Sequence, residues 1–279
     1  MSKKLVTCEN LADALARLPA GGTDVSLTQV YGEYEPSGEF YDLTVEDTTI
    51  TLEAYVPPTP LENWVIVILG EGASASHDES NERYDLYNEE TGEWVYLSEE
   101  NSLLPAGMPI MMRMHYNPEN MDYQQQLNWS GGWHLSQFVI EYVAWGDGLQ
   151  GLHNLGRELL VRVPETLPLA INDLQDVFKE AYIFNQPLPL WNTESVRSFR
   201  GAFRSAESYN QSINTWSTDS VDAEVLDYAF ESMFEDAVSF NQDMSIAWCF
   251  PNGGLEPSRF SYNATAWEEN NKPNWICLP

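Results

Sequence analysis

Histidines, cysteines and carboxylates are the side chains of this 279-residue chain whose types and spacing could support acid–base, nucleophilic or metal chemistry. The histidines are isolated, with no pair on one helix face, and the cysteines are too few and too scattered for a zinc site or a disulfide framework. The chain lacks Gly-x-Ser-x-Gly, P-loop, dinucleotide-binding and His-Glu-x-x-His motifs. The sequence therefore predicts no catalytic residue, no metal ligand and no cofactor. The residues concerned are His77, His115, His134 and His153, with Cys8, Cys249 and Cys277, of which the last two either pair or stay free thiols.

Acidic and aromatic segments offer two further candidate sites. Residues 78–90 carry enough carboxylate oxygens for calcium, but they lack the spacing of an EF-hand, so a solvated acidic loop is the favoured interpretation. Trp129 and Trp133 flank a Ser-Gly-Gly turn and form a candidate patch for surface contact, sugar stacking included, with two core tryptophans as the alternative. A glycosidase needs only two placed carboxylates, and with 43 acidic residues such a pair could be drawn almost anywhere.

The charge of the chain restricts its partners. The 43 acidic residues against 13 Lys plus Arg give a net charge of −30, which argues against nucleic acid and against an anionic membrane surface. The composition is 43% hydrophobic, which is too apolar for a disordered acidic tail. The longest apolar run, Trp64–Leu69, is too short to span a bilayer, and the first residues do not form a secretory signal. The sequence therefore predicts a folded, acidic protein without membrane insertion.

Hydrophobic alternation predicts a β-rich N-terminal part. We expect a first unit at 1–60, with a helix near residues 10–18, strands at 24–30, 41–45 and 48–56, and a role as an anchor. A second β-rich domain at 61–139 contains expected strands at Trp64–Leu69, 94–97 and 109–116. A third unit, 140–279, is set apart by an internal repeat.

The repeat is an aromatic-Asn-Gln triplet that occurs three times, at steps of 25 and 31 residues, each time followed by an apolar residue and a tryptophan. An insertion near residues 222–227 explains the longer step. The Asn side chains are expected to bond unpaired backbone groups from one coil to the next, so all these residues are predicted to be structural. They are Phe184, Asn185, Gln186 and Trp191; Tyr209, Asn210, Gln211 and Trp216; and Phe240, Asn241, Gln242 and Trp248.

Ahead of each triplet, apolar residues recur at the spacing of one helix face, as at Val196, Phe199, Phe203 and Ala206. Each repeat therefore reads as a short helix followed by an extended segment, too small to bury its own aromatic residues, so that neighbours must stack. The predicted fold class is α+β: a β-rich N-terminal part followed by a leucine-rich-repeat-like solenoid of short helix plus extended coils.

The pattern Phe-x-x-Ala-x-x-Phe-Asn-Gln-x-Leu-x-x-Trp-x-Thr-x-x-Val-x-x-Phe resembles the BspA-like leucine-rich-repeat surface proteins, including the mycoplasma lipoprotein repeats. The similarity extends over residues 140–279, with an opening coil from Val143 and a closing cap that ends at Trp275. What the resemblance implies is interaction without chemistry, because such repeats occur in surface adhesins and in virion proteins of tailed phages.

Three functions follow as expectations. The first is a non-enzymatic structural protein on the surface of a tailed-phage virion, as a capsid decoration, head fibre or tail component, whose partners are other virion proteins, a host receptor or a glycan. A net charge of −30 suits such a protein, because it keeps a high-copy component soluble. The alternative is a bacterial cell-surface adhesin, and the third is a carbohydrate-binding protein or glycosidase. An oligomer is compatible with each of them.

Overall fold

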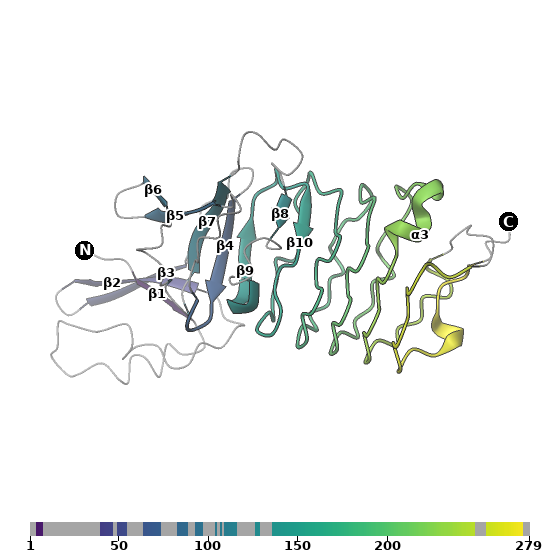
Figure 1. Cartoon of the computed structure of the whole chain (residues 1–279). Helices are drawn as coiled ribbons and strands as arrows, with labels where there is room; N and C mark the ends of the chain where they lie inside the picture. The colour runs from purple at the N-terminus through teal and green to yellow at the C-terminus, as the bar shows by residue number, and fades with distance from the viewer. Residues whose placement is uncertain are drawn as a thin grey trace.

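The computed structural model describes residues 4–7, 40–46, 49–54, 64–73, 83–88, 93–96, 104, 107, 109–115, 126–128, 136–248 and 255–275. Their strands form a five-stranded antiparallel sheet in the order β6-β5-β7-β4-β9, a three-stranded antiparallel sheet β1-β2-β3, and a parallel pair of β8 with β10 (Figure 1). The strands are β1 (Lys4–Thr7), β2 (Phe40–Glu46), β3 (Thr49–Ala54), β4 (Trp64–Leu69), β5 (Arg83–Asn88), β6 (Glu93–Tyr96), β7 (Pro109–His115), β8 (Gln126–Asn128), β9 (Val139–Trp145) and β10 (Gly151–His153).

The predicted strand at Trp64–Leu69 is confirmed as β4, the interior strand between β7 and β9. Its residues from Val65 to Leu69 are fully or almost fully buried, which explains why this strand is apolar without alternation. The strands expected at 41–45, 48–56, 94–97 and 109–116 are found as β2, β3, β6 and β7, with shifts of a few residues at their ends. The helix near 10–18 and the strand at 24–30 lie outside the described residues.

Part of the acidic segment 78–90 differs from the solvated loop that the sequence predicted. Its part Arg83–Asn88 is strand β5, which pairs with β6 on one side and β7 on the other, and is not a solvated loop. In the register of the sheet, Leu86 lies opposite Val95 of β6 and Met112 of β7. Strands β1, β8, β9 and β10 were also missed.

The predicted fold class is wrong. In the described residues the helix-plus-strand solenoid is not present: α-helix is limited to the four-residue α3 (Leu226–Ala229), beside short 3-10 segments η4 (Ser136–Phe138), η5 (Ala223–Val225) and η6 (Glu269–Asn271). The segments expected to be helical, around Phe178, Phe203 and Phe234, are turns, and regular structure is otherwise mostly β-strand.

Beyond β9 the chain runs through successive layers (Figure 1), and we call this part, residues 151–275, the stack. Backbone hydrogen bonds align five layers, which begin at residues 151, 173, 198, 229 and 256. N–H groups of one layer donate to carbonyls of the next layer: Leu174 N donates to Ser198 O at 3.0 Å, and Phe199 N donates to Ala229 O at 2.8 Å. Strand β9 joins sheet and stack, because it pairs with β4 on one side while Tyr142 N donates to Arg162 O on the other.

Consecutive four-residue turns replace the expected helices. In the second layer, Asp176, Phe178 and Glu180 donate their N–H groups to the third layer, while the residues between them donate back three positions along the chain. Residues with φ near +60° recur at four-residue intervals. They prevent an α-helix, because a residue in the left-handed conformation cannot continue a right-handed helix. They are Asp176 and Glu180, Gly201 and Ser205, Ser232 and Asp236, and Arg259 and Asn263.

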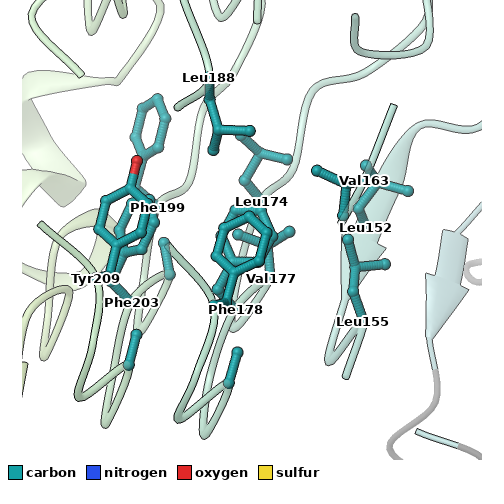
Figure 2. Packing of buried hydrophobic residues seen from close by; sticks show 14 of the residues in the cluster. Leu152, Leu155, Val163, Leu174, Val177, Phe178, Leu188, Phe199, Phe203 and Tyr209 are labelled. Atoms are coloured by element: carbon teal, nitrogen blue, oxygen red, sulfur yellow. The ribbon is translucent and has the colours of Figure 1, made fainter. Parts of the chain in front are cut away.

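The buried side chains of sheet and stack form one continuous hydrophobic core, from Val65 in β4 to Trp267 in the last layer. Leu152 and Leu155 of the first layer pack toward Phe178 of the second, which in turn faces Phe203 of the third (Figure 2). Because the layers share this core, none of them buries its own aromatic residues alone.

Candidate interaction surface

Asparagine side chains hold successive layers together along one edge of the stack. Asn185 Oδ1 accepts from the backbone N of Asn210 at 2.9 Å and from Gln211 Nε2 at 3.1 Å. Asn210 Oδ1 repeats both contacts one layer on, to Asn241 N at 2.9 Å and Gln242 Nε2 at 2.8 Å. Each amide oxygen thus satisfies backbone and side-chain donors of the next layer, which is a structural use of these groups.

The ladder also closes at both ends. Gln186 pairs its amide with both backbone groups of Val163, through Oε1 to N at 2.8 Å and Nε2 to O at 3.0 Å. At the other end Asn241 Oδ1 accepts from Glu268 N at 3.0 Å and Asn271 Nδ2 at 3.0 Å. All six Asn and Gln residues of the three triplets therefore lie in one hydrogen-bonded row.

Tryptophans form a second row inside the stack. The indole rings of Trp191 and Trp216 stack at 5.8 Å between centroids with planes 7° apart, and both rings are buried. Each indole N–H donates to a backbone carbonyl, for example Trp191 Nε1 to Pro164 O at 3.0 Å and Trp248 Nε1 to Trp216 O at 3.2 Å. A buried indole needs such an acceptor, so the tryptophans bind layer to layer as well as filling space.

Phenyl rings form two more rows. Phe184, Tyr209 and Phe240 stack at 5.9 and 6.1 Å with planes within 4°, and Trp267 ends the row edge-on against Phe240 at 4.7 Å. Phe203 stacks on Phe178 and on Phe234 at 5.4 Å each in the parallel row. In the last layer, Trp267 and Phe260 lie edge-on to the rings of the fourth layer, so the parallel stacking of both rows ends there.

The outer face of the turns carries charges that are paired between layers. Arg200 Nε contacts Glu231 Oε2 at 2.8 Å, and the Arg200 guanidinium also lies over the ring of Tyr228 at 4.9 Å. Glu235 is buried between two bases: Arg204 at 3.5 Å in the layer before and Arg259 in the layer after. The hydrogen bond from Arg259 lowers the pKa of the Glu235 carboxyl, against the opposing effect of burial.

Asp176 and Gly201 are neighbours in equivalent positions of adjacent layers. An ideal Cβ on Gly201, whose φ is +60°, would lie 2.2 Å from Asp176 Oδ1, so the carboxylate occupies the place of a side chain. Burial there raises the pKa of Asp176, although Lys179, Arg200, His153 and Arg204 act in the opposite direction. The charged side chains of this face, such as Arg200 and Glu235, therefore form ion pairs within the stack.

A hollow of about 210 Å³ lies at the edge of the first two layers. Its floor includes the buried Leu167 and Ile171, and two exposed leucines stand at its rim, Leu169 at 85% and Leu190 at 59% exposure. Thr166, Asn192 and Ser195 supply polar atoms around it. Neither leucine was predicted as a site residue. The turns of the structure place Leu169 opposite Glu194 and Asp219 of the next two layers.

Several candidate residues of the sequence analysis lie outside the described residues. These are Trp129 and Trp133, the three cysteines, His77 and His134, and most of 78–90. His153 is described and buried, with Nε2 3.1 Å from Asp173 Oδ2, a contact within the fold. Among the residues that the structure describes, no group of three or more His, Cys, Asp and Glu could hold a metal ion, and no helix is long and apolar enough to cross a membrane.

These rows define the C-terminal part as a repeat protein, built by stacking similar layers on a shared core. Residues 168–275 match the family described as "Mycoplasma protein of unknown function, DUF285", which is related to BspA-like repeat surface proteins. The similarity to mycoplasma repeats is therefore confirmed for this part of the chain, while the match contains nothing that points to a phage. No curated protein and no solved structure matches the chain.

Proposed function

We propose that this chain is a non-enzymatic structural and interaction protein, which presents the exposed edges of the stack to a macromolecular partner. The observation that carries this proposal is a contrast between equivalent positions. Inside, the layers repeat one residue type, as in Trp191 and Trp216, whereas an outer row changes from Leu169 to Glu194 to Asp219. A constant interior with a variable exterior is what a binding scaffold needs, because the fold is independent of the outer residues.

The insertion in the third layer supports the same proposal. Residues of η5 and α3 project there (Figure 1), and Val225 and Tyr228 of this segment are 49% and 54% exposed. In stacked-repeat proteins such insertions map to loops on one face, which is often the binding face. The protein would thus contact its partner through side chains that the repeats themselves do not dictate.

The surface of a tailed-phage virion is the first location that we propose, with the chain as a decoration, head-fibre or tail component. A net charge of −30 supports a high-copy assembly component, because like charge keeps the free protein soluble. Mass spectrometry with copy-number quantification on gradient-purified particles from the source tests this location. We expect tens to hundreds of copies per particle; absence from the particles would contradict it.

A bacterial cell surface is the second location, and the match of residues 168–275 to a Mycoplasma family favours it. Such an adhesin must be reachable on intact cells. Membrane-impermeant biotinylation of whole cells, followed by recovery of biotinylated protein, would label an adhesin. Labelling only after lysis, with the protein absent from particles as well, would overturn the proposal of a surface interaction protein at both locations.

A further inference from the structure

We infer that the hollow between Leu169 and Leu190 is the docking site for a basic segment of a partner protein, which inserts one apolar side chain between the two leucines. The inference rests on the proposed function and names the chemistry of the partner.

The two rim leucines are not needed by the fold. The turn that contains Leu169, closed by Ile171 N to Pro168 O, recurs with Val196 N to Thr193 O. The same turn recurs in the third layer. The position of Leu169 is occupied by Glu194 in the second layer and by Asp219 in the third. Leu190 likewise corresponds to Thr215, one residue before the next tryptophan. Leu169 thus stands where the next two layers have acidic residues, and Leu190 where the next layer has threonine. Exposed leucine at such positions is unfavourable in water unless a partner covers it.

The size of the hollow favours a side chain over a free small molecule. Its volume of about 210 Å³ is below the roughly 300–1,000 Å³ of small-molecule pockets. A hollow with a buried apolar floor and a rim that combines leucines with polar residues is the form of a protein–protein anchor site, in which one inserted side chain carries much of the affinity. Asn192 and Ser195 add polar groups to the lining, and Asn192 Oδ1 already accepts from Glu194 N at 2.9 Å.

The charge around the hollow selects a basic partner. Asp147, Glu165 and Glu194 are exposed beside the lining residues, and among the described residues none of the three belongs to an ion pair. The nearest bases along the chain are Arg162, three residues from Glu165, and Arg197, three residues from Glu194. Three carboxylates outnumber these two bases, so the surroundings keep a net negative charge, as the whole chain does. A second copy of this chain, at −30, would be repelled, whereas lysine or arginine beside the inserted residue would be attracted.

The test is a binding titration of the full chain with a designed probe. The probe is a fluorescein-labelled peptide with one leucine between two pairs of lysines, followed by fluorescence anisotropy at low ionic strength. We expect saturable binding that weakens with salt, together with shifts of the Leu169 and Leu190 methyl signals in NMR spectra. A peptide with alanine in place of leucine should bind at least about tenfold more weakly.

The decisive variant is Leu169→Glu with Leu190→Thr. The introduced glutamate and threonine are the residues found at the equivalent positions of the next layers, so the variant should keep the fold intact. It adds a negative charge, so electrostatics alone would strengthen binding of the cationic peptide; we expect a loss of about tenfold or more. Ile183→Ser is the matched control: Ile183 is 50% exposed, lies outside the hollow and corresponds to Ser208, and its variant should bind as wild type.

Three results would overturn the inference. They are equal binding by the double variant and wild type, equal binding of the alanine peptide, or self-association of the chain that the double variant abolishes, which would assign the hollow to a second copy. Any of these leaves the location on particles or cells untouched, because that experiment uses the wild-type protein. Failure of the inference and failure of the proposed function are therefore distinguishable.

Discussion

The five-stranded sheet and the stack bury hydrophobic residues in different ways. In the sheet, β4 is aliphatic from Val65 to Leu69 and each strand pairs antiparallel with its neighbours, so a buried side chain meets different residue types on each side. In the stack, a ring meets an equivalent ring above and below: Phe203 lies between Phe178 and Phe234 at 5.4 Å from each. The comparison teaches that the sheet depends on filling its volume, whereas the stack also depends on keeping the same shape at each level.

The largest effect is expected where a middle ring is removed. Phe203→Ala should lower the free energy of unfolding by about 3–5 kcal/mol, through the lost transfer energy and the cavity. Phe203→Leu should still cost about 1–3 kcal/mol, because each ring pair contributes about 0.5–1.5 kcal/mol beyond its area. Urea unfolding followed by tryptophan fluorescence measures both.

The matched substitution in the sheet is Met112→Leu, a buried residue of β7. A volume-conserving exchange of this kind should cost less than about 1.5 kcal/mol. If Phe203→Leu costs no more than Met112→Leu, the rows of rings contribute nothing beyond their volume, and the contrast between the two regions disappears.

The next largest effect is expected at Gly201, which tests the turn geometry of the stack. Gly201→Ala should cost about 1–3 kcal/mol, because alanine is strained at a φ of +60° and its Cβ meets the Asp176 carboxylate. In the background Asp176→Ala the cost should fall, since the contact has been removed. A double-mutant cycle in urea unfolding gives this coupling, and a coupling near zero would mean that the carboxylate simply moves aside.

Gly201 also shows why the helices were predicted wrongly. Apolar residues at Phe199, Phe203 and Ala206 have the spacing of a helix face, but turns closed every four residues bring the same positions to the core. The difference lies in the left-handed residues, and most of them are not glycine: Ser205 and Asp236 adopt φ near +60° without a sequence signal as strong as glycine. Hydrogen bonds to the next layer stabilise these turns. The local spacing of apolar residues carries no information about hydrogen bonds to a distant part of the chain.

Other parts of the molecule followed from the sequence more directly. The apolar run Trp64–Leu69 has no interpretation as a long helix, so β4 could be predicted to the residue. The Asn-Gln triplets could be assigned a structural part because they recur with the rings. The rim leucines and the pairing of Glu235 with Arg204 and Arg259 could not be predicted. Their partners come from neighbouring layers, 21 to 31 residues away, and only the alignment of layers in space identifies them.

The third prediction concerns Glu235, the buried carboxylate held by bases of the layers on either side. Glu235→Gln should cost about 1–2 kcal/mol at neutral pH, because hydrogen bonds to a charged group are lost. The pKa of Glu235 is lowered in the folded protein, so its stabilisation is present above the pKa of the unfolded state and is lost as the pH falls through the folded value. Thermal unfolding of both proteins across pH should show the difference vanishing in acid; a constant difference would contradict the assignment.

Asp176 is the built-in control for Glu235, because its pKa is shifted the other way. Burial raises the pKa of Asp176, so the protonated form favours folding, and this contribution is lost as the pH rises through the folded value. Asp176→Asn should therefore stabilise the protein at neutral pH and not in acid. The same sign for both variants would mean that the overall charge of the chain, not the local surroundings, sets the pH dependence.

The smallest effect compares two buried tyrosines, one in each region. Tyr142 of β9 donates its hydroxyl to Leu155 O at 2.7 Å, whereas the Tyr209 hydroxyl, in the row between Phe184 and Phe240, has no partner among the described residues. Tyr209→Phe should raise the free energy of unfolding by about 1 kcal/mol, since an unsatisfied buried hydroxyl is removed and the row becomes uniform. Tyr142→Phe should lower it by about the same amount, because the Leu155 carbonyl loses its donor. Urea titration measures both, and destabilisation by Tyr209→Phe would show that this hydroxyl has a partner, which would make the third layer an exception to the row it belongs to.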